Sequence, residues 1–257
     1  MTAEAPIRID RTDDIVTITL ANERQRNVLS AVAMQALLDA FREIAASDAT
    51  GVIVQAEGPV FSAGHNFGDM VDVEFADAKA LFDLCTEMMT TVQTMPQVVI
   101  AQVEGIATAA GCQLVATCDL AVAGESATFA APGGKGGLFC HTPMVAISRA
   151  VGTKHGLELA LTGDPIDAAT AHSWGMINRV VPDVSVAEAT RDLLRRATRG
   201  SRRSKALGKA TYYAQVQLPQ DEAYRYATAV MAAGVTTPEA QEGIASFLEK
   251  RRPSFPA

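Results

Sequence analysis

Short apolar segments alternate with amphipathic segments over about the first 140 residues, and only short connections separate them. Residues 30–45 carry apolar side chains at helical spacing behind Ser30, a residue type that often caps a helix. A second helix is predicted at 76–94, before Pro96. The predicted strands are 7–10, 15–20, 51–56, 97–103, 118–124 and 127–132. This alternation of strands and helices predicts an α/β fold.

The chain changes character after about residue 143, where helical patterns follow one another. Ser185 and Glu188 have the spacing of a capping box before one of these helices, and Pro238 favours the start of the last one. The predicted helices are 152–162, 167–174, 186–198, 202–215, 219–234 and one that begins at Thr237. We therefore expect an α/β core over residues 1–195 and a helical region over residues 196–257.

An excess of acidic residues limits the partners of the chain. The formal net charge is −7 and the isoelectric point is about 5.1, whereas nucleic-acid binding needs clustered Lys and Arg. The basic stretches 191–209 and 249–252 are either solvated helix faces or anion sites. We expect no nucleic-acid partner.

The four cysteines and four histidines lack the spacing of a metal site. Apolar surroundings predict buried, reduced thiols and a reducing compartment. The acidic start of the chain resembles neither a secretory signal nor a transit peptide. No apolar run reaches the roughly 18 residues of a membrane span. We expect a cytoplasmic protein without a metal ion or a membrane span.

Two loops that contain glycine each follow a short apolar strand, and they are the most suggestive features of the sequence. FSAGHNF (61–67) follows the strand 51–56, and GIATAAGCQL (105–114) follows the strand 97–103. Small residues let a backbone approach a ligand closely, and a loop that leads into a helix presents unpaired N–H groups. The two loops are either an oxyanion-binding pair or tight turns that serve packing alone.

The motifs resemble those of the crotonase superfamily, the enoyl-CoA hydratase/isomerase family. They are FSAGHNF, VEGIATAAGCQLVATCDLAVA and LTGDPIDAATAHSWGMINRVV, and the resemblance runs from Ile7 to Arg252. It implies a crotonase-type spiral of ββα units with a C-terminal helical trimerisation region. It also implies binding of acyl-CoA thioesters without a further cofactor, by a homotrimer or a dimer of trimers.

The resemblance assigns two backbone N–H groups to the thioester carbonyl, those of His65 and Ala110. In hydratases, two glutamates then hold and activate water. Gln113 and Gly133 stand at those two positions here, and Asn66 replaces the aspartate usual after the first donor. An amide does not titrate near neutral pH, so we expect weak or absent hydratase activity. Gly133 is expected to leave room for a substrate.

Other side chains are candidates for the missing acid–base role. Cys140 and His141 form one possible pair, although adjacent residues often point apart. The carboxylates of Asp69, Asp72 and Glu74 follow the first donor and form a second possibility, with solvated loop charges as the alternative. The glycines of 133–137 suggest a phosphate cradle, but without the spacing of one. Asp119 is expected to be structural.

The resemblance also assigns contacts with coenzyme A. Ala63 and Gly64 offer backbone, while Arg24 and Arg26 lie at the turn before the first helix. The C-terminal residues Phe247, Lys250 and Arg251 are assigned to a coenzyme A phosphate site, often that of a neighbouring subunit. The alternative for these last charges is an exposed helix end.

Two functions remain open on the sequence. The first is an acyl-CoA enzyme of this family with an unidentified acid or base. The second is a non-catalytic acyl-CoA carrier, sensor or partner subunit. A dinucleotide-binding domain is excluded because no strand-associated GxGxxG motif is present.

Overall fold

A computed structural model describes residues 5–255 of the chain. Its main sheet has six strands in the order β1-β2-β3-β5-β7-β10. The first pair is antiparallel and the other pairs are parallel. The strands are β1 (Ile7–Thr12), β2 (Ile15–Leu20), β3 (Gly51–Ala56), β5 (Val98–Val103), β7 (Leu120–Gly124) and β10 (Arg179–Val181).

A second, smaller sheet lies beyond the ends of these strands, in the order β4-β6-β8-β9. Its strands are β4 (Val60–Ser62), β6 (Ile106–Thr108), β8 (Thr128–Ala130) and β9 (Ile166–Asp167). Each of β3, β5 and β7 continues into one short strand of this sheet before the next helix. This repetition of two strands and a helix is the predicted spiral of ββα units, so the α/β prediction is confirmed.

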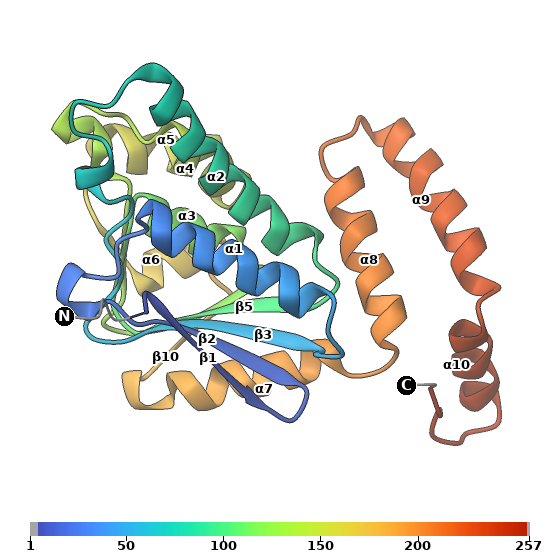
Figure 1. The fold of residues 1–257 in the computed structure, drawn as a ribbon. Coiled ribbons are helices and arrows are strands. Elements are labelled where there is room, and N and C mark those ends of the chain that lie inside the picture. Colours follow the sequence, from blue (N-terminus) through green and yellow to red (C-terminus); the bar gives the residue numbers. More distant parts are fainter. Residues whose placement is uncertain (1–4, 256–257) are drawn as a thin grey trace.

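Helices cover both faces of the main sheet (Figure 1). Val52 and Val54 of β3 belong to the large core that includes α1, whereas Ile53 packs with Val186 and Leu194 of α7 on the opposite face. This alternation is the period of two that a strand imposes on its side chains. The helices of this part are α1 (Ala31–Ala45), α2 (Phe75–Thr94), α3 (Ala110–Thr117), α4 (His141–Val151), α5 (Thr153–Thr162), α6 (Ala168–Ser173) and α7 (Val186–Thr198).

One local prediction is wrong. The capping box at Ser185 does not form, because a 3-10 turn (Asp183–Ser185) leads directly into α7 and Ser185 already has helical backbone angles. Helix α4 is an addition to the predicted elements. The cap at Ser30 is confirmed, since its Oγ accepts a hydrogen bond from the Ala33 N–H at 3.2 Å.

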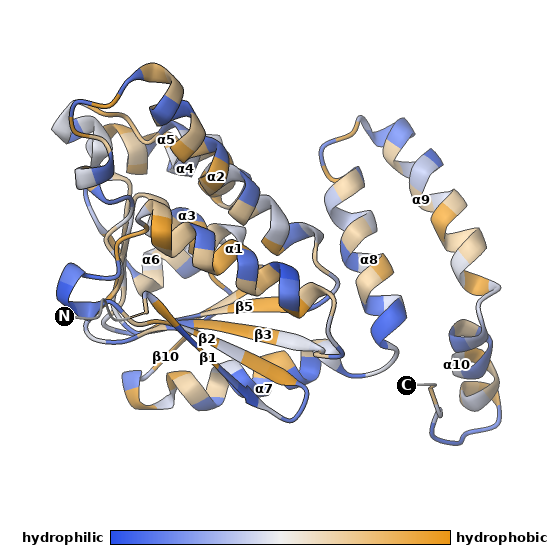
Figure 2. Cartoon of the chain, in the orientation of Figure 1, coloured by the Kyte–Doolittle hydropathy of each residue, from blue (hydrophilic) through white to orange (hydrophobic). Residues whose placement is uncertain are grey.

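The last three helices, α8 (Arg202–Gln215), α9 (Gln220–Val235) and α10 (Pro238–Leu248), stand beside the rest of the molecule (Figure 1). Thr237 caps α10 and Pro238 begins it, as predicted. Apolar residues occur along these helices (Figure 2), yet α8 and α9 bury none of their residues. The chain alone therefore leaves apolar faces of this region uncovered.

Candidate functional site

Three neighbouring strands of the small sheet bring the predicted site residues together. β4 pairs in parallel with β6, and β6 pairs in parallel with β8. Because the strands run in the same direction, the loops that follow them emerge at the same edge. These loops carry residues 63–66, 109–110 and 131–133, in which five predicted site residues lie: Ala63, Gly64, His65, Ala110 and Gly133.

The first two loops are in direct contact. A β-carbon on Gly64 would lie 2.9 Å from the Ala109 β-carbon and 3.2 Å from the Ala110 nitrogen. Gly64 also has a φ of +87°, which L side chains rarely adopt. Ala109 has a positive φ of 50° without being glycine, a strained conformation that is concentrated at functional sites. The structure thus places the backbones of Gly64 and Ala110 side by side.

The amides of His65 and Ala110 are the two donors at this contact. Ala110 is the first residue of α3, so its N–H has no acceptor within the helix. Within residues 5–255, neither amide donates a hydrogen bond to a protein atom. Two adjacent unpaired N–H groups can bind one carbonyl oxygen and stabilise negative charge that develops on it.

The side chain of His65 turns toward helix α2. Its ring packs edge-on against Phe82, with the ring centroids 5.2 Å apart. Burial lowers the pKa of His65, and the nearby charge of Asp69 opposes this shift. The imidazole is therefore better suited to packing as a neutral ring than to carrying charge.

Gln113 lies one helical turn after Ala110 and is only 4% exposed. Its Oε1 is buried and has no hydrogen-bond partner among the described residues. The surrounding turn of α3 is small and apolar. A carboxylate at this position would lose its hydration, whereas the neutral amide avoids that larger penalty.

Gly133 does not leave an open space, contrary to our expectation. A β-carbon there would lie 2.1 Å from the carbonyl oxygen of Leu138 and 2.8 Å from the Sγ of Cys140. The Gly133 carbonyl also accepts a hydrogen bond from the Leu138 N–H at 3.0 Å. The segment 138–140 therefore folds back onto Gly133 and occupies the space that a side chain would need.

The expected pair of Cys140 and His141 does not form. Cys140 is buried and its Sγ accepts a hydrogen bond from the Gly133 N–H at 3.3 Å. Burial raises the pKa of Cys140, so its thiol stays protonated. His141 is exposed and lies against Phe139. The structure gives neither residue the arrangement of a nucleophile and its base.

The carboxylates that follow His65 are not placed to act as a base. Both oxygens of Asp69 accept hydrogen bonds, from the Ala31 N–H at 2.8 Å and from the Asn66 side chain at 3.0 Å. Asp72 and Glu74 are exposed. Asp69 is thus a helix cap rather than a poised base, a role that its position 38 residues from Ala31 concealed.

The suggested phosphate cradle at 133–137 is not supported. These residues form a short 3-10 turn, Pro132–Gly136. The ammonium of Lys135 is paired with Asp164, so its charge is already neutralised.

The residues expected to contact coenzyme A lie in two separate places. Arg24 and Arg26 are exposed at the loop that precedes α1, and the Arg26 carbonyl accepts a hydrogen bond from the Ala63 N–H at 3.0 Å. Neither guanidinium makes a salt bridge within the described part of the chain. The other expected residues lie on the opposite side of the molecule, Phe247 near the end of α10 and Lys250 and Arg251 just after that helix (Figure 1).

Arg251 differs from the expectation. Its guanidinium is bidentate to Glu242, at 2.6 and 2.8 Å, and also contacts Glu249 at 2.6 Å. These carboxylates raise the pKa of Arg251, and Arg251 lowers the pKa of Glu242 to about 2. Lys250 is exposed and makes no salt bridge within residues 5–255. Lys250 and Arg252 are therefore the exposed cations of this segment without a carboxylate partner among the described residues.

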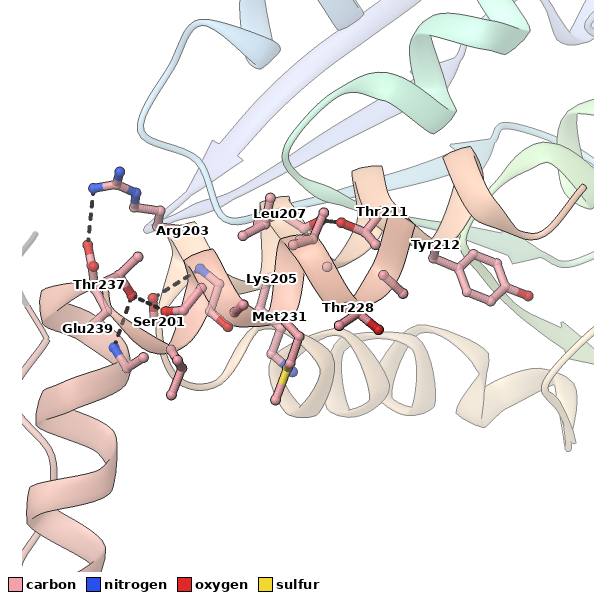
Figure 3. A pocket seen from close by; sticks show the side chains of 18 of the residues that line it. Ser201, Arg203, Lys205, Leu207, Thr211, Tyr212, Thr228, Met231, Thr237 and Glu239 are labelled. Atoms are coloured by element: carbon pink, nitrogen blue, oxygen red, sulfur yellow. Dashed lines mark hydrogen bonds and ion pairs between the residues drawn. The ribbon is translucent and has the colours of Figure 1, made fainter. Parts of the chain in front are cut away.

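A hollow of about 1750 Å³ lies between α8, α9 and α10, away from the two loops. Leu207 of α8 and Met231 of α9 line it together with polar residues such as Thr211 (Figure 3). It is formed by the region with uncovered apolar faces and has none of the predicted site residues in its lining.

The described residues also bear on metal binding and membrane insertion. Within residues 5–255, no group of three His, Cys, Asp or Glu side chains is placed to hold a metal ion. No helix in the same range is both long and apolar enough to cross a membrane.

Comparison with known proteins places these observations in a family. Residues 10–257 match the model of the enoyl-CoA hydratase/isomerase family. The chain is 43% identical over 245 residues to mouse "Enoyl-CoA hydratase domain-containing protein 3, mitochondrial", covering 94% of this chain and 81% of the relative. This agrees with the resemblance to that protein that the segments 107–123, 132–143 and 242–253 show.

Two solved structures have the same fold over nearly the whole chain. An enoyl-CoA hydratase from Mycobacterium smegmatis superposes with a TM-score of 0.95 at 40% identity, covering 98% of this chain and 99% of that one. Human enoyl-CoA hydratase domain-containing protein 3 superposes with a TM-score of 0.93 at 40% identity, covering 97% and 100%.

The comparison corrects the expected location. The mouse relative is named as a mitochondrial protein, which contradicts the cytoplasmic location expected from the start of the chain and the reduced thiols. The acidic first residues, on which that expectation rested, lie outside the described structure in part, since residues 1–4 are not described.

Proposed function

The chain belongs to the enoyl-CoA hydratase/isomerase family, and on this premise we propose that it binds an acyl-CoA thioester and polarises the thioester carbonyl. The backbone N–H groups of His65 and Ala110 donate to the carbonyl oxygen. The observation that carries the proposal is the contact of Gly64 with Ala109 and Ala110, which sets two unpaired amides side by side. One such donor is typically worth about 10²–10³ in rate for a reaction that develops an oxyanion.

The proposed site is ill equipped to hydrate an enoyl thioester. Hydration needs groups that give and take protons, and Gln113 and Gly133 supply none. Cys140 is protonated and Asp69 is engaged at α1. Standard hydratase activity is therefore weak or absent, and the polarised carbonyl serves another purpose.

Two purposes fit this site. A polarised thioester has a more acidic α-carbon and a more electrophilic carbonyl, which suits an isomerase or lyase whose base lies on the ligand or on a neighbouring subunit. The buried, neutral state of Gln113 and Cys140 favours the second purpose, a non-catalytic carrier or sensor of acyl-CoA. Both share the same binding step.

We propose further that α8 to α10 form an oligomerisation region, giving a homotrimer or a dimer of trimers. In the single chain, Met231 is 74% exposed and Phe247 is 83% exposed, which is unfavourable for apolar side chains in water. A second copy that covers this region would bury them. The same contact would carry Lys250 toward the coenzyme A site of a neighbour.

The test begins with the purified oligomer. Acyl-CoAs that co-purify are identified by mass spectrometry, and calorimetry then measures the affinity for each one and for free coenzyme A. The proposal expects tighter binding of the thioester than of free coenzyme A and slow or absent loss of the crotonyl-CoA absorbance. Folded protein that binds no acyl-CoA of any chain length would overturn the proposal, and hydration at an ordinary enzymatic rate would overturn its account of Gln113.

A further inference from the structure

The segment that carries the His65 amide is tied to the segment that leads into α1. The Ala63 N–H donates to the Arg26 carbonyl at 3.0 Å, and the Leu29 N–H donates to the Gly64 carbonyl at 2.8 Å. These two hydrogen bonds fix the chain immediately before His65. The direction of the His65 N–H also depends on how the chain is held after it.

His65 itself pairs with Leu29 in an isolated parallel β-bridge, and the carboxylate of Asp69 adds a side-chain connection beyond this bridge. Its Oδ2 accepts a hydrogen bond from the Ala31 N–H at 2.8 Å, and its Oδ1 accepts one from the Asn66 Nδ2 at 3.0 Å. The Asn66 Oδ1 in turn accepts from the Gly68 N–H at 3.1 Å. The turn that begins at Asn66 is therefore closed on itself, and Asp69 is its side-chain anchor to the first residue of α1.

Two side chains cap the N-terminus of α1, one adjacent to the helix in sequence and one distant from it. Ser30 precedes the helix and accepts from the Ala33 N–H, whereas Asp69 accepts from the Ala31 N–H although it lies 38 residues away in sequence. Both caps satisfy N–H groups that the helix itself leaves unpaired. Only the cap by Asp69 connects α1 with the loop of His65.

The negative charge of Asp69 lies at the N-terminus of α1. The first turn of α1 contains no acidic residue of its own, so Asp69 supplies the negative charge that stabilises a helix N-terminus. A carboxylate left unpaired near His65 would oppose negative charge on a thioester oxygen. Its hydrogen bonds to Ala31 and Asn66 hold it toward α1.

We propose that Asp69 is a positioning residue for the His65 half of the oxyanion site, acting by capping α1 across the loop. This inference rests on the proposed function, because it assigns a purpose to the orientation of the His65 amide. Asp69 does not touch the ligand and transfers no proton.

The experiment compares Asp69→Ala with Ser30→Ala in the full-length oligomer. Each variant removes one cap of α1, but only the first releases the loop 64–69. Hydrogen exchange of the peptide spanning 61–70 is measured without ligand. The carbonyl stretching frequency of butyryl-CoA, labelled with carbon-13 at the thioester, is measured when bound. The affinity for butyryl-CoA is compared with that for free coenzyme A.

We expect Asp69→Ala to lose most of the shift in carbonyl frequency and to bind butyryl-CoA about tenfold more weakly, with free coenzyme A unchanged. Exchange in 61–70 should rise. Ser30→Ala should keep the frequency shift while losing similar thermal stability. Asp69→Asn, which keeps one acceptor oxygen, should lie between them and serves as the test if the alanine variant folds poorly.

A full frequency shift in Asp69→Ala, or an equal loss in Ser30→Ala, would overturn the inference. The first would mean that the loop holds the His65 amide without its anchor, and the second that any weakening of α1 has the same effect. A wild-type protein that binds no butyryl-CoA and shifts no carbonyl frequency would instead overturn the proposed function, and unchanged exchange in Asp69→Ala would then overturn the anchoring role separately.

Discussion

The ammonium of Lys209 lies 2.7 Å from the Oδ2 of Asp119, and the two side chains are only 9% and 13% exposed. Lys209 also donates to the carbonyls of Val92, at 2.8 Å, and Gln97, at 2.7 Å, so its three N–H bonds are all used. The Tyr213 hydroxyl donates to the other oxygen of Asp119 at 2.9 Å. Burial alone raises the pKa of Asp119 and lowers that of Lys209, and their mutual attraction opposes both shifts. This network fastens α8 to the end of α2 and to the main sheet, so Asp119 is structural, as predicted.

Breaking this pair should weaken the fold strongly. Lys209→Met leaves the charge of Asp119 buried without its partner, and loss of one member of a buried pair typically costs about 3–5 kcal/mol. Urea unfolding at neutral pH measures the loss, and size-exclusion chromatography shows whether the displaced α8 also weakens assembly. The double variant with Asp119→Asn should recover part of the stability because no unpaired charge remains. A loss below about 1 kcal/mol would be that of a surface ion pair and would contradict this account.

The packing of Gly133 predicts different effects for two nearby glycines. Gly133→Ala should lower the free energy of unfolding by about 1–3 kcal/mol, because its β-carbon meets the Leu138 carbonyl at 2.1 Å and the backbone must shift. Gly136→Ala is the matched control, since nothing lies within 4 Å of its added β-carbon. Thermal unfolding of both variants decides the matter. Equal stabilities would show that the segment 138–140 moves aside freely.

Replacing Gln113 should not restore a hydratase. In Gln113→Glu the new carboxyl group is buried, so burial raises its pKa above the ordinary value for glutamate. A raised pKa in the folded state gives stability that is present at low pH and lost as pH rises through that pKa. Unfolding measured at several pH values should therefore show that the free energy of unfolding of the variant decreases relative to that of the wild type as pH rises. Combining it with Gly133→Glu should yield unfolded or inactive protein rather than hydration of crotonyl-CoA, and measurable turnover by that double variant would contradict the prediction.

Regular elements could be predicted from the sequence, and close contacts between distant segments could not. β3 and α7 occupy their predicted ranges because the spacing of apolar residues within each segment indicates its secondary structure. β4 and β6 have three residues each, too few to show a period, and they are formed by pairing with each other. The close packing around Gly133 and the cap by Asp69 likewise depend on residues brought together only by the fold. For Arg251, Glu242 lies nine residues away, and only the turn after α10 reveals the pair.

The cations assigned to coenzyme A should respond unequally to substitution. Arg24→Ala and Arg26→Ala each remove an exposed guanidinium without a salt bridge among the described residues, so both should weaken coenzyme A esters and reduce the salt dependence of binding. Lys250→Ala should do the same if a neighbouring subunit supplies it. Arg251→Ala should change affinity little, because Glu242 and Glu249 already neutralise its guanidinium. Calorimetry with coenzyme A and pantetheine esters at two salt concentrations separates phosphate contacts from folding defects. Equal losses with both ester types would point to a folding or assembly defect.

The buried imidazole of His65 should make stability depend on pH while leaving the oxyanion site intact. Burial lowers the pKa of His65 in the folded state below the ordinary 6.5, and Asp69 only partly offsets this. As pH falls through 6.5, His65 becomes protonated in the unfolded chain but stays neutral in the folded chain. The free energy of unfolding therefore decreases with falling pH until the lower pKa of the folded state is reached. His65→Gln removes this titration but keeps the backbone N–H. Its loss of unfolding free energy between about pH 7.5 and about pH 5 should be smaller than that of the wild type. The variant His141→Gln is the control, because it removes an exposed imidazole that the fold does not bury.

The bound thioester of labelled butyryl-CoA should show the same carbonyl frequency in His65→Gln as in the wild type, because the donor is the main-chain N–H. An unchanged pH profile in His65→Gln would contradict the burial of a neutral ring, and a lost frequency shift would mean that the imidazole itself helps to bind the ligand.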